Sequence, residues 1–215
     1  MFPGDTYNGA VLGAVLATAL TFDVLISAGH EGRPASCARF PQRRCNLGAD
    51  GERAWSPIVA DAATQVLRHH GVSVARLPAD FDGEYRVDAA AFIHFDGSSP
   101  PCESGASIGF HEPSSAPAAA AWRELYGRYF PFRFQPDNFT TGLRDYYGFR
   151  QTSARDFALV LELGEITCPV QHEWLAPRLR WEGALLAYFL SERIGKGNVP
   201  DPGPYRGAEA PKKAY

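Results

Sequence analysis

Three ionisable side chains interrupt or end segments that otherwise have the character of buried strands. His30 follows the apolar run "DVLIS", His94 lies inside "FIHF", and Glu162 lies inside "LVLELGE". Burying an ionisable group is costly unless it is paired or bound to a metal. One such residue is usually a satisfied core side chain. Three of them at strand ends, where open α/β sheets bind their ligands, favour a functional site.

The chemistry that these residue types support is metal-assisted hydrolysis. A further carboxylate, Glu52, comes just ahead of the first long helix. Two imidazoles and one carboxylate form a common Zn²⁺ ligand set that leaves the fourth position for water. A second carboxylate beside that water acts as a general base.

The elements that must position these groups alternate along the chain. Ser56 as N-cap, Pro57 at the first helical position and Gly71 after the end predict a helix between them. Apolar patterning predicts strands at 23–27, 72–77, 90–95 and 157–163, and helices at 57–70, 115–129 and 177–194. This order predicts an α/β fold: a single domain with a mostly parallel, twisted central sheet flanked by helices.

Length and charge limit the class of protein. A chain of 215 residues is long enough for one well-packed domain. Its formal net charge of −3 provides no basic surface of the kind that nucleic-acid binders need, so we expect no nucleic-acid partner.

The ends of the chain are assigned from composition. The stretch "GAVLGAVLATAL" lacks a preceding Lys or Arg and is too short to span a bilayer, which favours a packed N-terminal helix at 8–20 over a signal peptide and predicts no stable membrane insertion. We therefore predict a catalytic domain at 1–195 and a flexible tail at 196–215, which is rich in Gly, Pro and Lys.

The four cysteines leave two readings open. No Cys-x-x-Cys pair occurs, which argues against a structural thiolate zinc site. Cys37 and Cys45 bracket a short loop and could close it as a disulfide in an oxidising compartment. Four free thiols in a reducing compartment are the equal alternative.

Several motifs in order resemble one enzyme family. "LISAGHEG" resembles a strand that runs into a Pro-Gly-His-Gly-like turn, and Glu52 precedes an apolar helix, a Gly and the strand "VSVARL". "AFIHFDG" resembles a Ser-x-His-Ala-Asn strand, "GASIGFHE" a following Gly-led strand, and "YGFRQTSARDFALVLELGEITCP" the closing stretch with a Val-Glu-x-Gly-Phe-like motif. Together, over residues 23–194, they resemble the zinc-dependent N-acetylmuramoyl-L-alanine amidases, which are peptidoglycan hydrolases.

The resemblance implies a role for each matched residue. His30, Glu52 and His94 would hold Zn²⁺, and Glu162 would take a proton from the attacking water and pass it to the leaving amine. The bond cleaved would be the amide between N-acetylmuramic acid and L-alanine in peptidoglycan. Arg150, ahead of the last strand, could contact a substrate carboxylate.

The sequence also departs from the family pattern. Glu31 stands where the family has a Gly, and Pro57 falls inside the family's helix, so Glu31 and Glu52 are rivals for the carboxylate ligand. Glu165 replaces the family's Phe and is the alternate to Glu162.

Two other functions fit the same residues. One is a different zinc amidohydrolase that acts on a small amide or peptide, deformylase-like or carboxypeptidase-like. The other is a non-catalytic wall-binding module. For the amidase we expect a monomer that is periplasmic or secreted, or a phage endolysin released to the cell wall.

Overall fold

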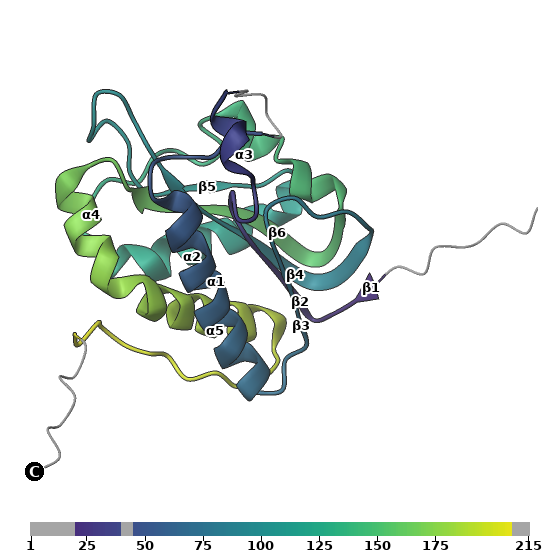
Figure 1. Cartoon of the computed structure of the whole chain (residues 1–215). Helices are drawn as coiled ribbons and strands as arrows, with labels where there is room; N and C mark the ends of the chain where they lie inside the picture. The colour runs from purple at the N-terminus through teal and green to yellow at the C-terminus, as the bar shows by residue number, and fades with distance from the viewer. Residues whose placement is uncertain (1–19, 40–44, 208–215) are drawn as a thin grey trace, which may run out of the picture.

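A six-stranded sheet organises the chain, which the computed structural model describes over residues 20–39 and 45–207 (Figure 1). The strand order is β3-β2-β4-β6-β5, and β1 pairs with β4. All pairings are parallel except that of β5 with β6. The strands are β1 (Leu20–Thr21), β2 (Val24–Ala28), β3 (Val74–Leu77), β4 (Tyr85–Asp96), β5 (Ser107–Gly109) and β6 (Thr152–Glu165). The predicted α/β domain with a mostly parallel sheet is confirmed, and its antiparallel edge strand β5 makes the sheet mixed.

Three long helices match the three that patterning predicts. They are α1 (Glu52–His69), α2 (Ala116–Gly127) and α5 (Leu179–Ile194). The shorter helical segments are η1 (Ala35–Arg39), η2 (Pro113–Ser115), α3 (Thr141–Arg144), η3 (Tyr147–Arg150), α4 (Pro169–Leu175) and η4 (Ala176–Arg178). These short segments have too few turns to produce a helical period in the sequence, and the sequence analysis does not predict them.

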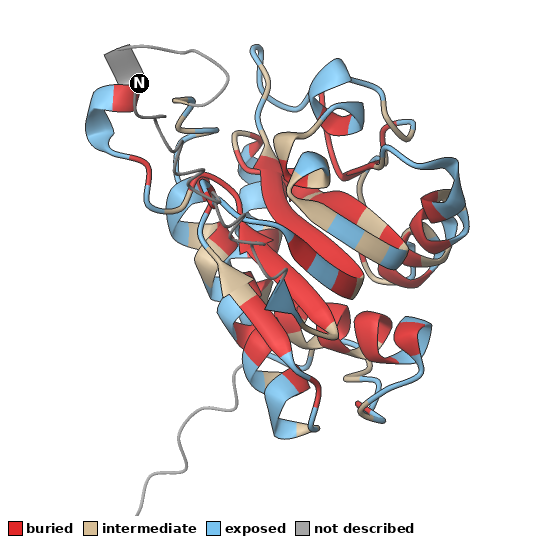
Figure 2. Cartoon of the chain, turned by 90° about the vertical axis from the view of Figure 1, so that its right-hand side faces the viewer, coloured by how far each residue is buried: buried red, intermediate tan, exposed pale blue. Residues whose placement is uncertain are grey.

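The two faces of the sheet are covered differently. Val24 and Ile26 of β2 belong to the core that packs against α1, α2 and α5, whereas Leu25 between them belongs to a second core on the opposite face. That second core is closed by short segments and loops, among them Phe81 and Leu143. Figure 2 shows the central strands largely buried; β2 is buried throughout, whereas β1 is exposed and the first half of β6 is mostly exposed or intermediate. Among the described residues no long helix packs on the second face, and Leu143 and Val160 of this second core line a cleft.

The start of α1 corrects the sequence analysis. The helix begins at Glu52, after Gly51 with φ 90°, and Pro57 lies inside it. Ser56, expected to cap the helix, is fully buried within it. Pro57 costs one backbone hydrogen bond, but burial of Val59 and its neighbours against the sheet and α5 keeps the helix continuous. Glu52 is therefore the first residue of this helix and does not lie ahead of it as the sequence analysis expects.

The ends of the domain lie partly outside the described residues. Of the predicted helix 8–20, only Leu20 is described, and it begins β1. Residues 196–207, predicted to begin a flexible tail, have no helix or strand but pack on the domain: Val199 is buried, and Lys196 forms ion pairs with Asp23 and Asp88. No helix in the described residues is long and apolar enough to cross a membrane.

Both pairs of cysteines form disulfides. Cys37 bonds to Cys45, one of the two alternatives that the sequence left open. Cys102 bonds to Cys168, a pair not predicted because 66 residues separate its members. This second bond ties the loop after β4 to the residue that precedes α4.

Candidate metal centre

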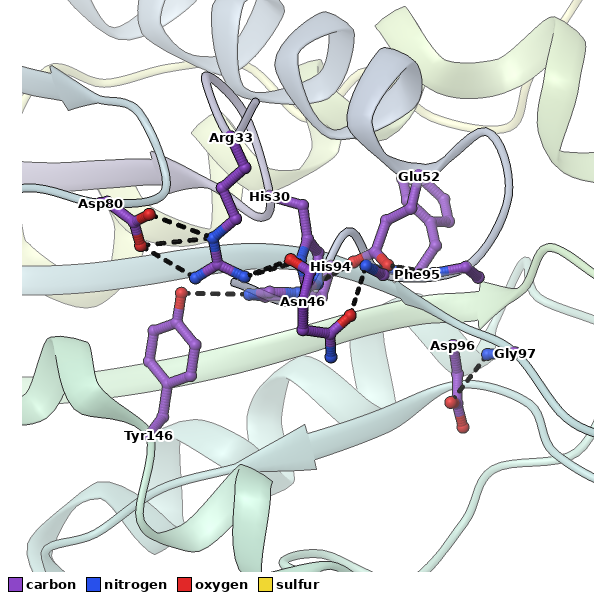
Figure 3. Close-up of polar contacts among 12 residues, drawn as sticks. His30, Arg33, Asn46, Glu52, Asp80, His94, Phe95, Asp96, Gly97 and Tyr146 are labelled. Atoms are coloured by element: carbon purple, nitrogen blue, oxygen red, sulfur yellow. Dashed lines mark hydrogen bonds and ion pairs between the residues drawn. The ribbon is translucent and has the colours of Figure 1, made fainter. Parts of the chain in front are cut away.

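Three elements bring His30, Glu52 and His94 together at the carboxyl edge of the parallel strands (Figure 3). His30 lies in the turn that follows β2, His94 lies near the end of β4, and Glu52 is the first residue of α1. His30 has φ 59°, a left-handed conformation that costs a non-glycine residue about 1–2 kcal/mol. A strained backbone that aims one side chain at a shared point is typical of functional sites.

The three side chains are close enough to share one ion. Glu52 Oε1 lies 2.8 Å from His94 Nδ1 and 3.4 Å from His30 Nε2. One donor atom from each residue lies within 4.8 Å of the other two. All three residues are buried, with exposed fractions of 8%, 2% and 7% in chain order. Two imidazoles and a carboxylate in this arrangement suit a divalent transition metal and leave coordination positions open.

Two glycines allow the ligands to approach the backbone. A Cβ atom on Gly29 would lie 2.4 Å from His94 Nδ1, and one on Gly48 would lie 2.0 Å from Glu52 Oε2. Both positions therefore exclude every larger residue while the ligands keep their places. The need for Gly48 arises from a contact across the fold, so no sequence pattern reveals it.

Hydrogen bonds orient both imidazoles. His30 Nδ1 donates to the carbonyl oxygen of Asn46 at 2.7 Å, which leaves Nε2 directed at Glu52. His94 Nε2 lies 3.1 Å from the hydroxyl of Tyr146, which leaves Nδ1 directed at Glu52. Metal-binding histidines generally use their second ring nitrogen in this way. The sequence analysis assigns no role to Asn46 or Tyr146.

Electrostatics favour the metal-binding forms of two of the ligands, His30 and Glu52. Burial, together with the charge of His94, lowers the pKa of His30 to about 4, so its imidazole is neutral near pH 7. Burial opposes ionisation of Glu52, but the hydrogen bond from His94 and the charges of both histidines lower its pKa overall. Neutral imidazoles and an ionised carboxylate are the species that bind metal ions.

Glu162 lies beside this cluster without joining it. It is the register partner of His94 on the adjacent parallel strand β6, so both side chains project from the same face of the sheet. Its Oε2 atom is buried and has no hydrogen-bond partner in the described structure. Burial raises the pKa of Glu162 well above its ordinary value, and the charges of Glu52 and Asp96 raise it further. A half-buried carboxylate with a raised pKa and one buried oxygen without a partner is the kind of group that accepts a proton in catalysis.

The rival carboxylates are engaged elsewhere. Glu31 pairs with Arg76 through both carboxylate oxygens, at 2.7 and 3.1 Å. Glu165 is fully buried and accepts hydrogen bonds from the backbone of Cys102 and Ser104 and from the hydroxyls of Ser98 and Thr167. These bonds outweigh the effect of burial and lower its pKa. Glu165 thus organises the loop after β4.

Two clefts meet at the cluster. Both are lined by His30, Asn46, His94 and Glu162. One, of about 250 Å³, is also lined by Arg33, Thr140, Asp145, Tyr146 and Tyr147. The other, of about 440 Å³, is also lined by Asp96, Ser98, Ser99 and Thr167. Arg150, predicted to contact substrate, is exposed at the end of η3 and lines neither cleft. The cluster is therefore open to both clefts.

Comparisons with known proteins define the fold. No family model matches the sequence, and no curated protein matches it. The structure is similar to Cwp6 from Clostridium difficile, with a TM-score of 0.59 and 16% identity over 83% of this chain and 30% of that one. It is also similar to the N-acetylmuramyl-L-alanine amidase Ami1 from Mycobacterium smegmatis (TM-score 0.57, 18% identity, 83% of this chain and 98% of that one). A third similar structure is the catalytic domain of CwlV, an N-acetylmuramoyl-L-alanine amidase from Bacillus (Paenibacillus) polymyxa var. colistinus (TM-score 0.52, 14% identity, 82% and 99%). The chain thus has the fold of N-acetylmuramoyl-L-alanine amidase catalytic domains.

Proposed function

We propose that this protein is a zinc-dependent hydrolase that cleaves the amide bond between N-acetylmuramic acid and L-alanine in peptidoglycan. The observation that carries the proposal is the buried His30–Glu52–His94 cluster with the unpaired Glu162 carboxylate beside it, in the fold of amidase catalytic domains. The two clefts that the cluster lines leave space for the glycan and for the peptide of such a substrate.

In the proposed mechanism three residues bind the metal and a fourth transfers a proton. His30, Glu52 and His94 would hold Zn²⁺, which when bound lowers the pKa of a water ligand and polarises the scissile carbonyl. Glu162 would accept a proton from the attacking water on its unpaired Oε2 atom. Because burial and neighbouring charges raise its pKa, Glu162 would keep this proton until the leaving amine takes it.

The proposed setting is the cell wall. Two disulfides favour an oxidising compartment over a reducing one. A wall hydrolase meets its substrate there whether it is exported by its own cell or released as a phage endolysin. We propose that it acts as a monomer.

The test combines metal content with product chemistry. Elemental analysis of the purified protein should find about one Zn²⁺ per chain in the wild type and almost none in His94→Ala. Incubated with purified sacculi, the wild type should release stem peptides whose new N-terminal residue is L-alanine, with the glycan strands left intact, as mass spectrometry would show. His94→Ala should release none.

Other results would redirect the proposal. Bound zinc with no release from sacculi, but hydrolysis of small amides, would assign another zinc amidohydrolase. Sedimentation with sacculi without bound zinc would assign a wall-binding module.

Gly48→Ala tests the close packing around Glu52. Gly48 has φ 74° and Gly71 has φ 79°, so alanine at either position costs a similar backbone strain of about 1 kcal/mol. Only at position 48 does the added Cβ meet a ligand, because nothing lies within 4 Å of a Cβ at position 71. We expect Gly48→Ala to weaken zinc binding and Gly71→Ala to leave it unchanged, as measured by chelator competition. Equal zinc affinities in the two variants would contradict this packing argument.

A further inference from the structure

Arg33 is a buried arginine beside the candidate metal centre, to which the sequence analysis assigns no role. It is 7% exposed and lines the smaller cleft. Its Nε and Nη2 atoms donate to the carboxylate of Asp80, at distances from 2.9 to 3.3 Å. Its Nη1 atom donates to the carbonyl oxygen of Asn46 at 2.6 Å. Figure 3 shows the guanidinium between Asp80 and the imidazole of His30.

The Asn46 carbonyl oxygen determines which nitrogen of His30 carries the proton. This oxygen lies 2.7 Å from His30 Nδ1. A carbonyl oxygen only accepts hydrogen bonds, so a deprotonated Nδ1 at this distance would place two lone pairs against each other. Nδ1 therefore carries the hydrogen, and Nε2, 3.4 Å from Glu52 Oε1, has the free lone pair that a metal requires.

Arg33 also lies close to His30 itself, and the shared acceptor explains this. Arg33 Nη1 is 2.9 Å from His30 Nδ1, although both atoms are hydrogen-bond donors in this tautomer. The Asn46 oxygen accepts from both of them, which brings the two nitrogens together. The guanidinium and the imidazole thus hold a single carbonyl oxygen in place.

The Asn46 carbonyl belongs to an irregular segment that follows the Cys37–Cys45 disulfide. Asn46 is exposed and lies in the segment between Cys45 and α1 that contains neither helix nor strand. Its own side chain accepts from the backbone of Gly48 and so contributes only a local turn. Arg33 connects this segment to Asp80, which follows β3, because its guanidinium donates to both.

We infer that Arg33 is a positioning residue for the metal centre: anchored on Asp80, it holds the Asn46 carbonyl against His30 Nδ1 and so keeps His30 Nε2 directed at the metal position. The inference rests on the proposed function in so far as it takes this position to be a zinc site.

The experiment compares Arg33→Met with Arg123→Met. Arg123 is a matched control because it also donates to a carboxylate, that of Asp137, and to a backbone carbonyl, that of Gln135, away from the metal centre. Loss of a hydrogen bond that orients a metal ligand typically weakens metal binding roughly 10- to 100-fold. We expect such a loss of Zn²⁺ affinity, measured by chelator competition, in Arg33→Met and none in Arg123→Met. Equal affinities in both variants and the wild type would overturn the inference.

A second readout needs no metal. In the metal-free wild type, ¹⁵N NMR of the imidazoles should show His30 protonated at Nδ1, and in Arg33→Met a substantial Nε2-protonated population should appear. An unchanged tautomer in Arg33→Met would overturn the inference. If the wild type binds no zinc, the proposed function fails, and this readout still decides the role of Arg33.

Arg33→Lys extends the test to a variant that keeps the charge. Lysine presents one ammonium group in place of the planar fork and does not reach Asp80 and the Asn46 carbonyl in the same geometry. We expect a weakened zinc affinity here too. If Arg33→Met does not fold, wild-type affinity in Arg33→Lys overturns the inference.

Discussion

Replacing Glu162 by Gln is expected to lower kcat by about 10²- to 10⁴-fold, the usual contribution of a general acid–base residue, while zinc content stays at the wild-type level. The amide has nearly the shape of the carboxylate but does not accept a proton from water. Glu162 lies outside the His30–Glu52–His94 cluster, so the ligands remain in place. Hydrolysis of sacculi or of a purified muropeptide measures kcat, and elemental analysis measures the metal.

The matched control is Glu165→Gln, the other carboxylate in the same motif. Glu165 accepts four hydrogen bonds from the loop after β4 and the segment that follows β6. An amide NH₂ group would face some of these donors, so we expect the free energy of unfolding to fall by about 1–3 kcal/mol. The activity of the folded fraction should change little. The opposite pattern, with catalysis lost in Glu165→Gln and retained in Glu162→Gln, would exchange the two roles.

Replacing Glu182 by Gln is expected to remove a large pH dependence of stability. Glu182 lies on α5 with no exposed surface, and burial raises its pKa to about 8. The Tyr126 hydroxyl lies 2.8 Å from the Leu163 carbonyl and 2.9 Å from Glu182 Oε1. Tyrosine has one hydroxyl hydrogen and the carbonyl only accepts, so a protonated Glu182 completes this chain as a donor to Tyr126.

The direction of the pH dependence of stability follows from which state, folded or unfolded, binds the proton of Glu182. Between its ordinary pKa near 4.5 and about 8, Glu182 keeps its proton in the folded state and loses it in the unfolded state. Stability from this group is therefore full at low pH and declines as the pH rises, by about 1.4 kcal/mol per pH unit and roughly 5 kcal/mol in total. In Glu182→Gln the amide N–H donates to Tyr126 at every pH, so this decline should disappear.

Urea denaturation from pH 5 to pH 9 measures the difference. Glu182→Gln should match the wild type near pH 5 and exceed it at pH 9. Glu124→Gln is the control, because Glu124 is exposed and its ion pair with Arg128 lies on the surface. It should show the wild-type slope. A wild-type slope in Glu182→Gln as well would mean that Glu182 is ionised in the folded protein.

The sequence predicts the fold well because the burial of apolar side chains is the main determinant of which helices and strands form. The strand around Leu159 and the helix around Leu186 are rich in apolar side chains, which are unfavourable in contact with water. Both elements are buried and form as predicted. The start of α1 was placed too late because Ser56 and Pro57 are together a typical local start signal. Burial of the helix against the sheet outweighs that local preference.

Within the site, the sequence by itself determined the donor types and their place at strand ends. His30, His94 and Glu162 can be picked out from the sequence because they are ionisable residues in or after apolar runs. Burying such a group is costly unless it is paired or bound, so its presence there indicates a function. Glu52 was a further candidate because it precedes the first long helix, and the structure places it with the two histidines.

Only the tertiary structure decided which of the candidate carboxylates faces the histidines and which form contacts elsewhere. Glu31 pairs with Arg76, Glu165 accepts hydrogen bonds from the loop after β4, and Glu52 contacts both histidines. The same holds for the Cys102–Cys168 disulfide and for the carbonyl that Arg33 holds against His30. Each of these depends on contacts between segments remote in the chain, where direction and distance decide the partner. Residue type and spacing carry neither direction nor distance, which is why hydrophobic burial could be inferred from the sequence and this polar arrangement could not.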